Sequence, residues 1–203
     1  MKWGEHLAAY SSDLFQRLSK KIGMKNVHES FEMLKTIVDN PAPGKLVDKL
    51  SGLRIAFVDS AFVSYFLKSF TDILGEHVSN RIIKEAHKVD GQHMVQIGKK
   101  MFGLKEADLM FAFYFWLYSA VGWGSLKELN LDKETLSGSV KWEDLGDSIP
   151  SMEKSKPIHV NMAGEISGAA EEAWGQPFEV EETSCAAQGK PYCEFKFNPR
   201  KGN

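Results

Sequence analysis

Two cysteines near the carboxyl end constrain this chain more than any other feature of its sequence. Cys185 and Cys193 are the only cysteines among 203 residues. Each lies beside a segment that alternates apolar and polar residues, 177–182 and 192–197, and a turn with Gly189 joins the two segments. This pattern predicts a hairpin that brings both sulfur atoms to one point. A bound zinc ion, two buried free thiols and a cross-hairpin disulfide are the alternatives, and a reducing cytosol disfavours the disulfide.

Two further residues can complete a metal site with these sulfur atoms. Glu182 lies three residues before Cys185, and His159 lies just before a segment rich in small residues. Zinc favours thiolates and takes four ligands in a tetrahedral structural site. Spacing alone still favours the metal-free alternatives, because the cysteines do not form a tandem pair of closely spaced couples.

The amino-terminal 50 residues are expected to form a helical extension. Apolar residues recur at helical spacing from Glu5 to Ile22 and again from Val27 to Val38, which predicts two amphipathic helices. The segment Asn40-Pro41-Ala42-Pro43-Gly44 would end the second helix, because it combines two prolines with a glycine. We therefore expect a helical extension over residues 1–50 and a main domain over residues 51–203.

The main domain is expected to have an α+β fold, with helices packed on an antiparallel β-sheet and a carboxy-terminal hairpin stapled by zinc. Gly91 predicts a bend or a close approach within its helix, and Gly164 and Gly168 predict close packing of theirs. The expected elements are a strand over 53–58, helices over 59–74, 77–101, 104–118 and 161–174, and strands over 125–131, 138–142, 177–182 and 192–197.

Charge and hydropathy exclude several classes of partner. Lys and Arg total 25 against 27 Asp and Glu, so no global cationic field would attract nucleic acid or an anionic membrane. The longest uncharged stretch, 109–123, is shorter than the roughly 20 apolar residues that cross a bilayer. The amino terminus lacks the features of a secretory signal. We expect a cytoplasmic protein without a membrane span.

The segment 156–175 (KPIHVNMAGEISGAAEEAWG), followed by Glu182-Thr-Ser-Cys185 and Gly189-Lys-Pro-Tyr-Cys193, resembles the 4-vinyl reductase domain. The resemblance is strongest to the phenol- and xylene-sensing amino-terminal modules of bacterial transcriptional activators. Their pattern is a metal-binding cysteine, a glycine pair on a helix, Glu-x-x-Cys and a last cysteine after a glycine turn.

This resemblance implies a structural zinc ion held by His159, Glu182, Cys185 and Cys193. His159 stands where the family usually has its first cysteine, and an imidazole nitrogen is also a good zinc ligand. The resemblance extends more thinly over residues 53–197. The amino-terminal segments of the sensors contribute to dimer contacts, so the helical extension is expected to support a homodimer.

The segment 109–118 has six aromatic rings within eight residues, which is more than one helix face needs. From the residues alone, a buried core helix and a ligand-lining helix remain equal alternatives. The resemblance implies a closed cavity for an aromatic ligand, lined by Phe111, Tyr118 and Trp142. Tyr118 stands where the phenol sensors have a hydrogen-bonding histidine. Glu165 replaces a residue that is usually aromatic, and a carboxylate beside an apolar cavity is costly unless it is paired.

We expect a sensor or carrier that binds a hydrophobic small molecule and acts through another protein, and we do not expect an enzyme. Gly122-Trp-Gly124 lacks the third glycine of a dinucleotide fingerprint, and the sequence has no Walker-type phosphate-binding loop. A zinc ion with four protein ligands has no open position for an activated water. A dimeric scaffold is the alternative, because vesicle-tethering subunits of the TRAPP type are thought to share this fold. A reductase of a tetrapyrrole vinyl group is less favoured. His87 and His93 are expected to be surface or packing residues.

Overall fold

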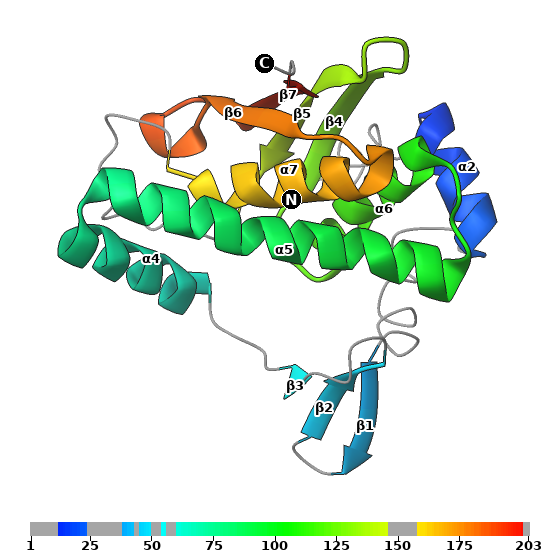
Figure 1. Cartoon of the computed structure of the whole chain (residues 1–203), viewed down its shortest axis with the longest axis horizontal. Coiled ribbons are helices and arrows are strands. Elements are labelled where there is room, and N and C mark those ends of the chain that lie inside the picture. Colours follow the sequence, from blue (N-terminus) through cyan, green and yellow to red (C-terminus); the bar gives the residue numbers. More distant parts are fainter. Residues whose placement is uncertain are drawn as a thin grey trace.

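A four-stranded antiparallel sheet with helices on one of its faces forms the main body of the protein (Figure 1). The computed structural model describes residues 12–23, 38–42, 45–49, 54–55, 60–145 and 158–200, and the statements below concern these residues. The arrangement confirms the α+β fold that the sequence predicts.

The sheet has the strand order β4-β5-β7-β6, so the two sequence-local hairpins lie side by side. Val140 pairs with Phe195 and Trp142 with Cys193 where the hairpins meet. Alternate side chains are buried along the strands, which gives the sheet one buried face, as their period-two patterns predict. The strands are β4 (Ser125–Asp132), β5 (Ser137–Glu143), β6 (Phe178–Ser184) and β7 (Cys193–Pro199).

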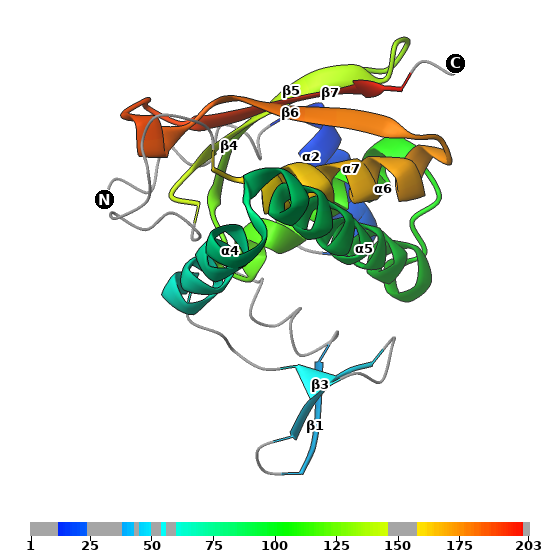
Figure 2. The same ribbon diagram turned by 60° about the vertical axis from the view of Figure 1, so that its left-hand side comes forward.

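The helices form successive layers below the buried face of the sheet (Figure 2). Helices α6 (Ala107–Ala120) and α7 (Val160–Trp174) pack against the strands. Helix α5 (Glu76–Phe102) packs on both of these helices, and α4 (Ser60–Leu74) packs on α5. None of the helices in the described ranges is long and apolar enough to cross a membrane.

Three glycines allow α5 and α7 to touch backbone to backbone. A Cβ atom on Gly91 would lie 2.0 Å from the carbonyl oxygen of Glu165. One on Gly168 would lie 1.9 Å from the carbonyl oxygen of Lys88, and one on Gly164 would also collide with the backbone of α5. The expected close approach is therefore confirmed on both helices. Helix α5 continues as a single element through Gly91.

Helix α6 supplies most of the aromatic core. Ten consecutive residues of this helix, Leu109 to Tyr118, are buried, because the sheet, α5 and α7 surround it. Its hydrophobic character all around the helix predicts this position. Phe15 and Leu18 of α2 (Asp13–Ile22) belong to the same core, so at least this part of the amino-terminal extension packs on the domain.

The stretch around residue 40 differs from the expectation. Strands β1 (Val38–Ala42), β2 (Lys45–Asp48) and β3 (Arg54–Ile55) form a small antiparallel sheet, which lies apart from the main body (Figure 1). The prolines and glycine predicted to end a helix instead mark a hairpin, and Pro41 is tolerated because β1 is an edge strand. Within the predicted extension over residues 1–50, this part is therefore not helical. Most of the predicted helix Val27–Val38 lies outside the described residues, as does the start of the helix predicted from Glu5.

Candidate metal centre

The structure brings His159, Glu182, Cys185 and Cys193 together in the interior. One nitrogen, oxygen or sulfur atom of each residue lies within 4.8 Å of those of the other three. His159, Cys185 and Cys193 are at most 1% exposed, and Glu182 is 9% exposed. These atoms form the four-residue centre.

Element ends position three of these side chains, and a strand positions the fourth. His159 is the residue before α7, Cys185 lies between β6 and the short 3₁₀ helix η2 (Ala186–Gln188), and Cys193 begins β7. Glu182 points to the buried face of β6, in alternation with the exposed Glu181. A register irregularity between Glu182 and Ser184 follows, and the chain then turns towards Cys193.

Hydrogen bonds hold the four-residue centre together. Glu182 Oε2 accepts a hydrogen bond from the backbone N–H of His159 at 2.9 Å, and Oε1 lies 2.7 Å from Nδ1 of the same residue. The backbone N–H of Ala186 donates to Cys193 Sγ at 3.2 Å. The carboxylate thus connects the carboxy-terminal hairpin to the start of α7.

The protonation of the two thiols is coupled. A hydrogen bond from Cys193, together with His159, lowers the pKa of the Cys185 thiol to about 3. The same hydrogen bond and burial raise the pKa of Cys193. Burial also raises the pKa of the Glu182 carboxyl, against the opposing effect of His159. The centre therefore favours one thiolate, and a cation bound to both sulfur atoms would favour two.

The distances fit a tetrahedral zinc site at the sulfur atoms. Bonds of about 2.3 Å to sulfur and about 2.0 Å to nitrogen place these ligand atoms roughly 3.5 Å apart in a tetrahedron. His159 Nδ1 lies 3.6 Å from Cys185 Sγ and 3.7 Å from Cys193 Sγ. The same geometry would place Glu182 Oε1 roughly 3.3 Å from Nδ1, so this hydrogen-bonded pair would separate by about half an ångström around the ion.

The three aromatic residues expected to line a cavity are all buried in the core. The ring centroids of Tyr118 and Trp142 lie 5.4 Å apart, in edge contact. Phe115 connects this pair to Phe111, with centroids 6.0 Å from Trp142 and 4.8 Å from Phe111. Trp142 Nε1 is buried and has no hydrogen-bond partner within the described part of the chain. A buried donor without a partner is costly, and a ligand acceptor would remove that cost.

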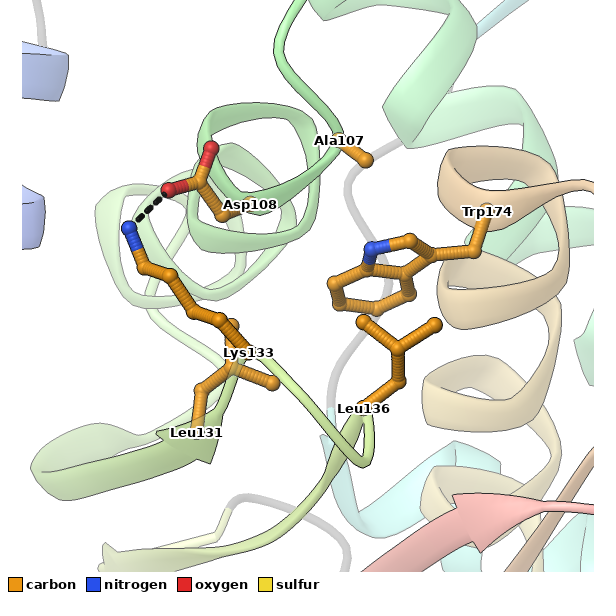
Figure 3. A pocket seen from close by; sticks show the side chains of 6 residues that line it. All are labelled: Ala107, Asp108, Leu131, Lys133, Leu136 and Trp174. Atoms are coloured by element: carbon orange, nitrogen blue, oxygen red, sulfur yellow. Dashed lines mark hydrogen bonds and ion pairs between the residues drawn. The ribbon is translucent and has the colours of Figure 1, made fainter.

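A pocket of about 270 Å³ lies at the amino-terminal end of α6, where Ala107 and Asp108 line it (Figure 3). Lys133 and Asp108 form an ion pair of 2.6 Å at its edge. Trp174 lines the pocket and contacts Phe111, with centroids 4.8 Å apart. Trp174 was not among the predicted lining residues, although its place just before Gly175 at the end of α7 is visible in the sequence. None of the predicted residues Phe111, Tyr118 and Trp142 lines this pocket.

Glu165 has the partners that its burial requires. Its carboxylate lies 2.9 Å from His87 Nδ1 and accepts a 3.4 Å hydrogen bond from the Tyr114 hydroxyl. His87 lies on α5 and is half-buried, so the packing role expected for it includes a polar contact with Glu165. His93 is also half-buried on the same helix.

Residues 149–199 match the 4-vinyl reductase domain family. The resemblance seen in the sequence is confirmed. The matched range includes all four residues of the centre. No curated protein matches the sequence.

Solved structures share the fold at low sequence identity. The phenol-responsive sensory domain of the transcription activator PoxR, solved with phenol, has a TM-score of 0.68 and 15% identity, over 86% of this chain and 90% of that one. A trafficking protein particle complex subunit 3 from Naegleria fowleri, covalently bound to palmitic acid, has a TM-score of 0.53 and 17% identity, over 70% of this chain and 95% of that one. These similarities concern the fold and leave the ligand of the present domain to be argued from its own residues.

Proposed function

We propose that the protein is a non-catalytic, cytoplasmic sensor or carrier that encloses a hydrophobic small molecule, aromatic compounds included. The observation that carries this proposal is the buried indole N–H of Trp142, which lies among apolar rings and has no hydrogen-bond partner among the described residues. A ligand with one polar group would satisfy this donor, while its apolar part would contact Tyr118 and Phe115. The likeness in fold to a phenol-responsive sensory domain supports the same interpretation.

We propose that a structural zinc ion occupies the four-residue centre. His159, Glu182, Cys185 and Cys193 would hold it, and the ion would supply a crosslink between the carboxy-terminal hairpin and the start of α7. Four protein ligands leave no open position for an activated water, which favours a structural role over a catalytic one.

The sheet register offers a connection between ligand and metal. Trp142 on β5 lies directly opposite Cys193 on β7. A ligand that displaces the indole would therefore shift the strand that carries a metal ligand. We propose that this neighbouring pair couples ligand binding to the packing of the carboxy-terminal hairpin, from which an output protein would read the state.

Mass spectrometry of an organic extract tests the binding role directly. Freshly purified protein should release a reproducible hydrophobic molecule, present at a molar amount that approaches that of the chain. Trp142→Phe keeps an aromatic ring but removes the N–H donor, and it should reduce the amount retained. Trp123→Phe is the matched control, because Trp123 is a half-buried tryptophan that keeps its own ring contact with Tyr118. A wild-type extract without any such molecule, together with no binding of added phenols, would contradict the proposal.

A homodimeric scaffold is the second candidate. The fold similarity to a trafficking particle subunit favours it, and so do the exposed large apolar side chains of α4 and α5. Exposed large apolar side chains are commonly covered in an assembly. These exposed side chains are Phe62, Tyr65, Phe66, Ile73, Leu74, Val78, Ile82 and Val89.

Light scattering and the extract separate the two candidates. A scaffold is expected to be dimeric and to release no ligand, whereas a sensor or carrier releases one whether or not it is dimeric. An enzymatic role would require turnover of a vinyl-bearing tetrapyrrole with an added reductant, and we expect none.

A further inference from the structure

A second group of metal-ligating side chains lies where α5 packs on α7. His87 Nδ1 is 2.9 Å from Glu165 Oε1 and 3.8 Å from Asp90 Oδ2, and the three ligand atoms lie within 4.8 Å of one another. Glu165 is six residues beyond His159 on α7, which corresponds to about 9 Å along the helix. This helix-pair cluster is therefore distinct from the four-residue centre.

The backbone holds the helix-pair cluster firmly. His87 and Asp90 are three residues apart on α5 and therefore share one face of that helix. Gly91, the next residue of α5, lies directly against the backbone of Glu165, so the two helices cannot separate without losing this contact. The Tyr114 hydroxyl binds Glu165 Oε2 and leaves Oε1 directed at the imidazole.

The burial and the chemistry of this cluster suit a cation. The side chain of Glu165 is 6% exposed, whereas those of His87 and Asp90 are 23% and 66% exposed. Two carboxylates and one imidazole offer oxygen and nitrogen ligands from one buried and one exposed side of the helix pair. A divalent ion would take the place between Glu165 and His87 that their hydrogen bond now holds, and it would bring Asp90 into the same contact.

We propose that His87, Asp90 and Glu165 form a site for a divalent cation of the Mn²⁺ class. One imidazole nitrogen and two carboxylate oxygens suit such ions, whereas thiolates suit softer ones. Ligand atoms at about 2.1 Å from an octahedral ion lie roughly 3.0 Å apart, so Glu165 already has the required spacing from His87, and Asp90 would move towards both residues. The exposed side chain of Asp90 has room for this movement. Three protein ligands leave positions for water or for an exogenous ligand.

Titration with Mn²⁺ followed by electron paramagnetic resonance tests this site. No zinc is added, because zinc would outcompete Mn²⁺ at nitrogen and oxygen ligands, and Mn²⁺ itself is a poor competitor for the thiolates of the four-residue centre. The wild type should bind about one Mn²⁺ per chain. Asp90→Asn and His87→Gln should each weaken binding by at least about tenfold, because each removes one of three ligands.

Glu85→Gln is the matched control, because Glu85 is an exposed carboxylate on the same helix. It should bind Mn²⁺ as the wild type does. Asp90 is exposed, so Asp90→Asn should fold, and its circular dichroism spectrum verifies this. Absence of Mn²⁺ binding by the wild type at millimolar ion would overturn the proposal. Equal affinity in Asp90→Asn, or an equal loss in Glu85→Gln, would overturn it too. None of these outcomes depends on whether the four-residue centre holds zinc.

Discussion

The four-residue centre and the helix-pair cluster use α7 in different ways. The first lies at the start of α7, is almost wholly buried and contains two sulfur atoms. The second lies in the middle of α7, has one exposed carboxylate and contains only nitrogen and oxygen ligands. Burial and ligand softness together thus favour a permanent structural ion at the first and an exchangeable ion at the second.

The comparison also separates two sources of rigidity. The four-residue centre joins elements that are distant in the sequence through side chains and through hydrogen bonds that backbone N–H groups donate to those side chains. The helix-pair cluster rests on a contact between backbones at Gly91 and Glu165. Removal of a ligand should therefore damage the first centre more than the second.

The largest expected effect follows from Cys193→Ala. If zinc crosslinks the hairpin to α7, this variant should lose the ion and about 3 kcal/mol or more of unfolding free energy. Elemental analysis and chemical denaturation measure the two losses. A strong chelator should destabilise the wild type but have little further effect on the variant. Unchanged stability in Cys193→Ala would contradict a structural ion.

Gly168→Ala should have the next largest effect, because its Cβ would lie 1.9 Å from the carbonyl oxygen of Lys88. We expect a loss of about 2 to 3 kcal/mol in unfolding free energy, since a backbone carbonyl cannot yield as a side chain can. Gly98→Ala is the control, because its Cβ would meet mainly the side chain of Phe113. Mn²⁺ affinity should fall in Gly168→Ala and zinc content should not. An equal loss of stability in both variants would show that the backbone contact is not the cause.

Added Mn²⁺ should stabilise the wild type by a smaller amount. At a free concentration about tenfold above the dissociation constant, binding to the folded state alone contributes about 1.4 kcal/mol. Thermal unfolding of wild type and Asp90→Asn measures this difference. Without Mn²⁺ the two proteins should unfold at similar temperatures, because Asp90 is exposed. An equal rise in unfolding temperature on addition of Mn²⁺ to both proteins would show that Asp90 does not bind the ion.

Asp108 offers a comparison with the carboxylates of the helix-pair cluster. It forms ion pairs with Arg17 and Lys133 of the protein itself. Burial raises the pKa of Asp108, but hydrogen bonds from Lys133 and Arg17 outweigh this effect and hold it below the ordinary value. Asp108→Asn should cost about 0.5 to 1 kcal/mol at neutral pH, because these ion pairs are partly exposed. A lowered pKa stabilises the fold above the ordinary carboxyl value, and this contribution is lost as the pH falls through the lowered pKa. The difference between wild type and variant in urea denaturation should therefore shrink at acidic pH, and Mn²⁺ should not alter it.

Most elements of the main body could be predicted from local patterns. Alternation of apolar and polar residues identifies β4 to β7, and an apolar surface all around α6 identifies a buried helix. The convergence of Cys185 and Cys193 follows from a hairpin with a short connection. Their meeting with His159 could be anticipated only from the family resemblance, because no local pattern relates the start of α7 to β6.

The remaining features depend on contacts that sequence patterns do not encode. Prolines and a glycine after Val38 fit either a helix end or a hairpin, and the structure has the hairpin β1–β2. The spacing between His87 and His93 says nothing of Glu165, which comes from a different helix. Trp174 lines the described pocket only because α7 ends beside the turn that carries Leu136. Each of these features requires the relative placement of two distant elements.

The interleaved glycines of α5 and α7 have a mechanical consequence. Because carbonyl oxygens of one helix lie in the gaps left by missing side chains on the other, a slide by one residue would drive a side chain into a peptide group. Helices α5 and α7 must therefore move together as one rigid unit.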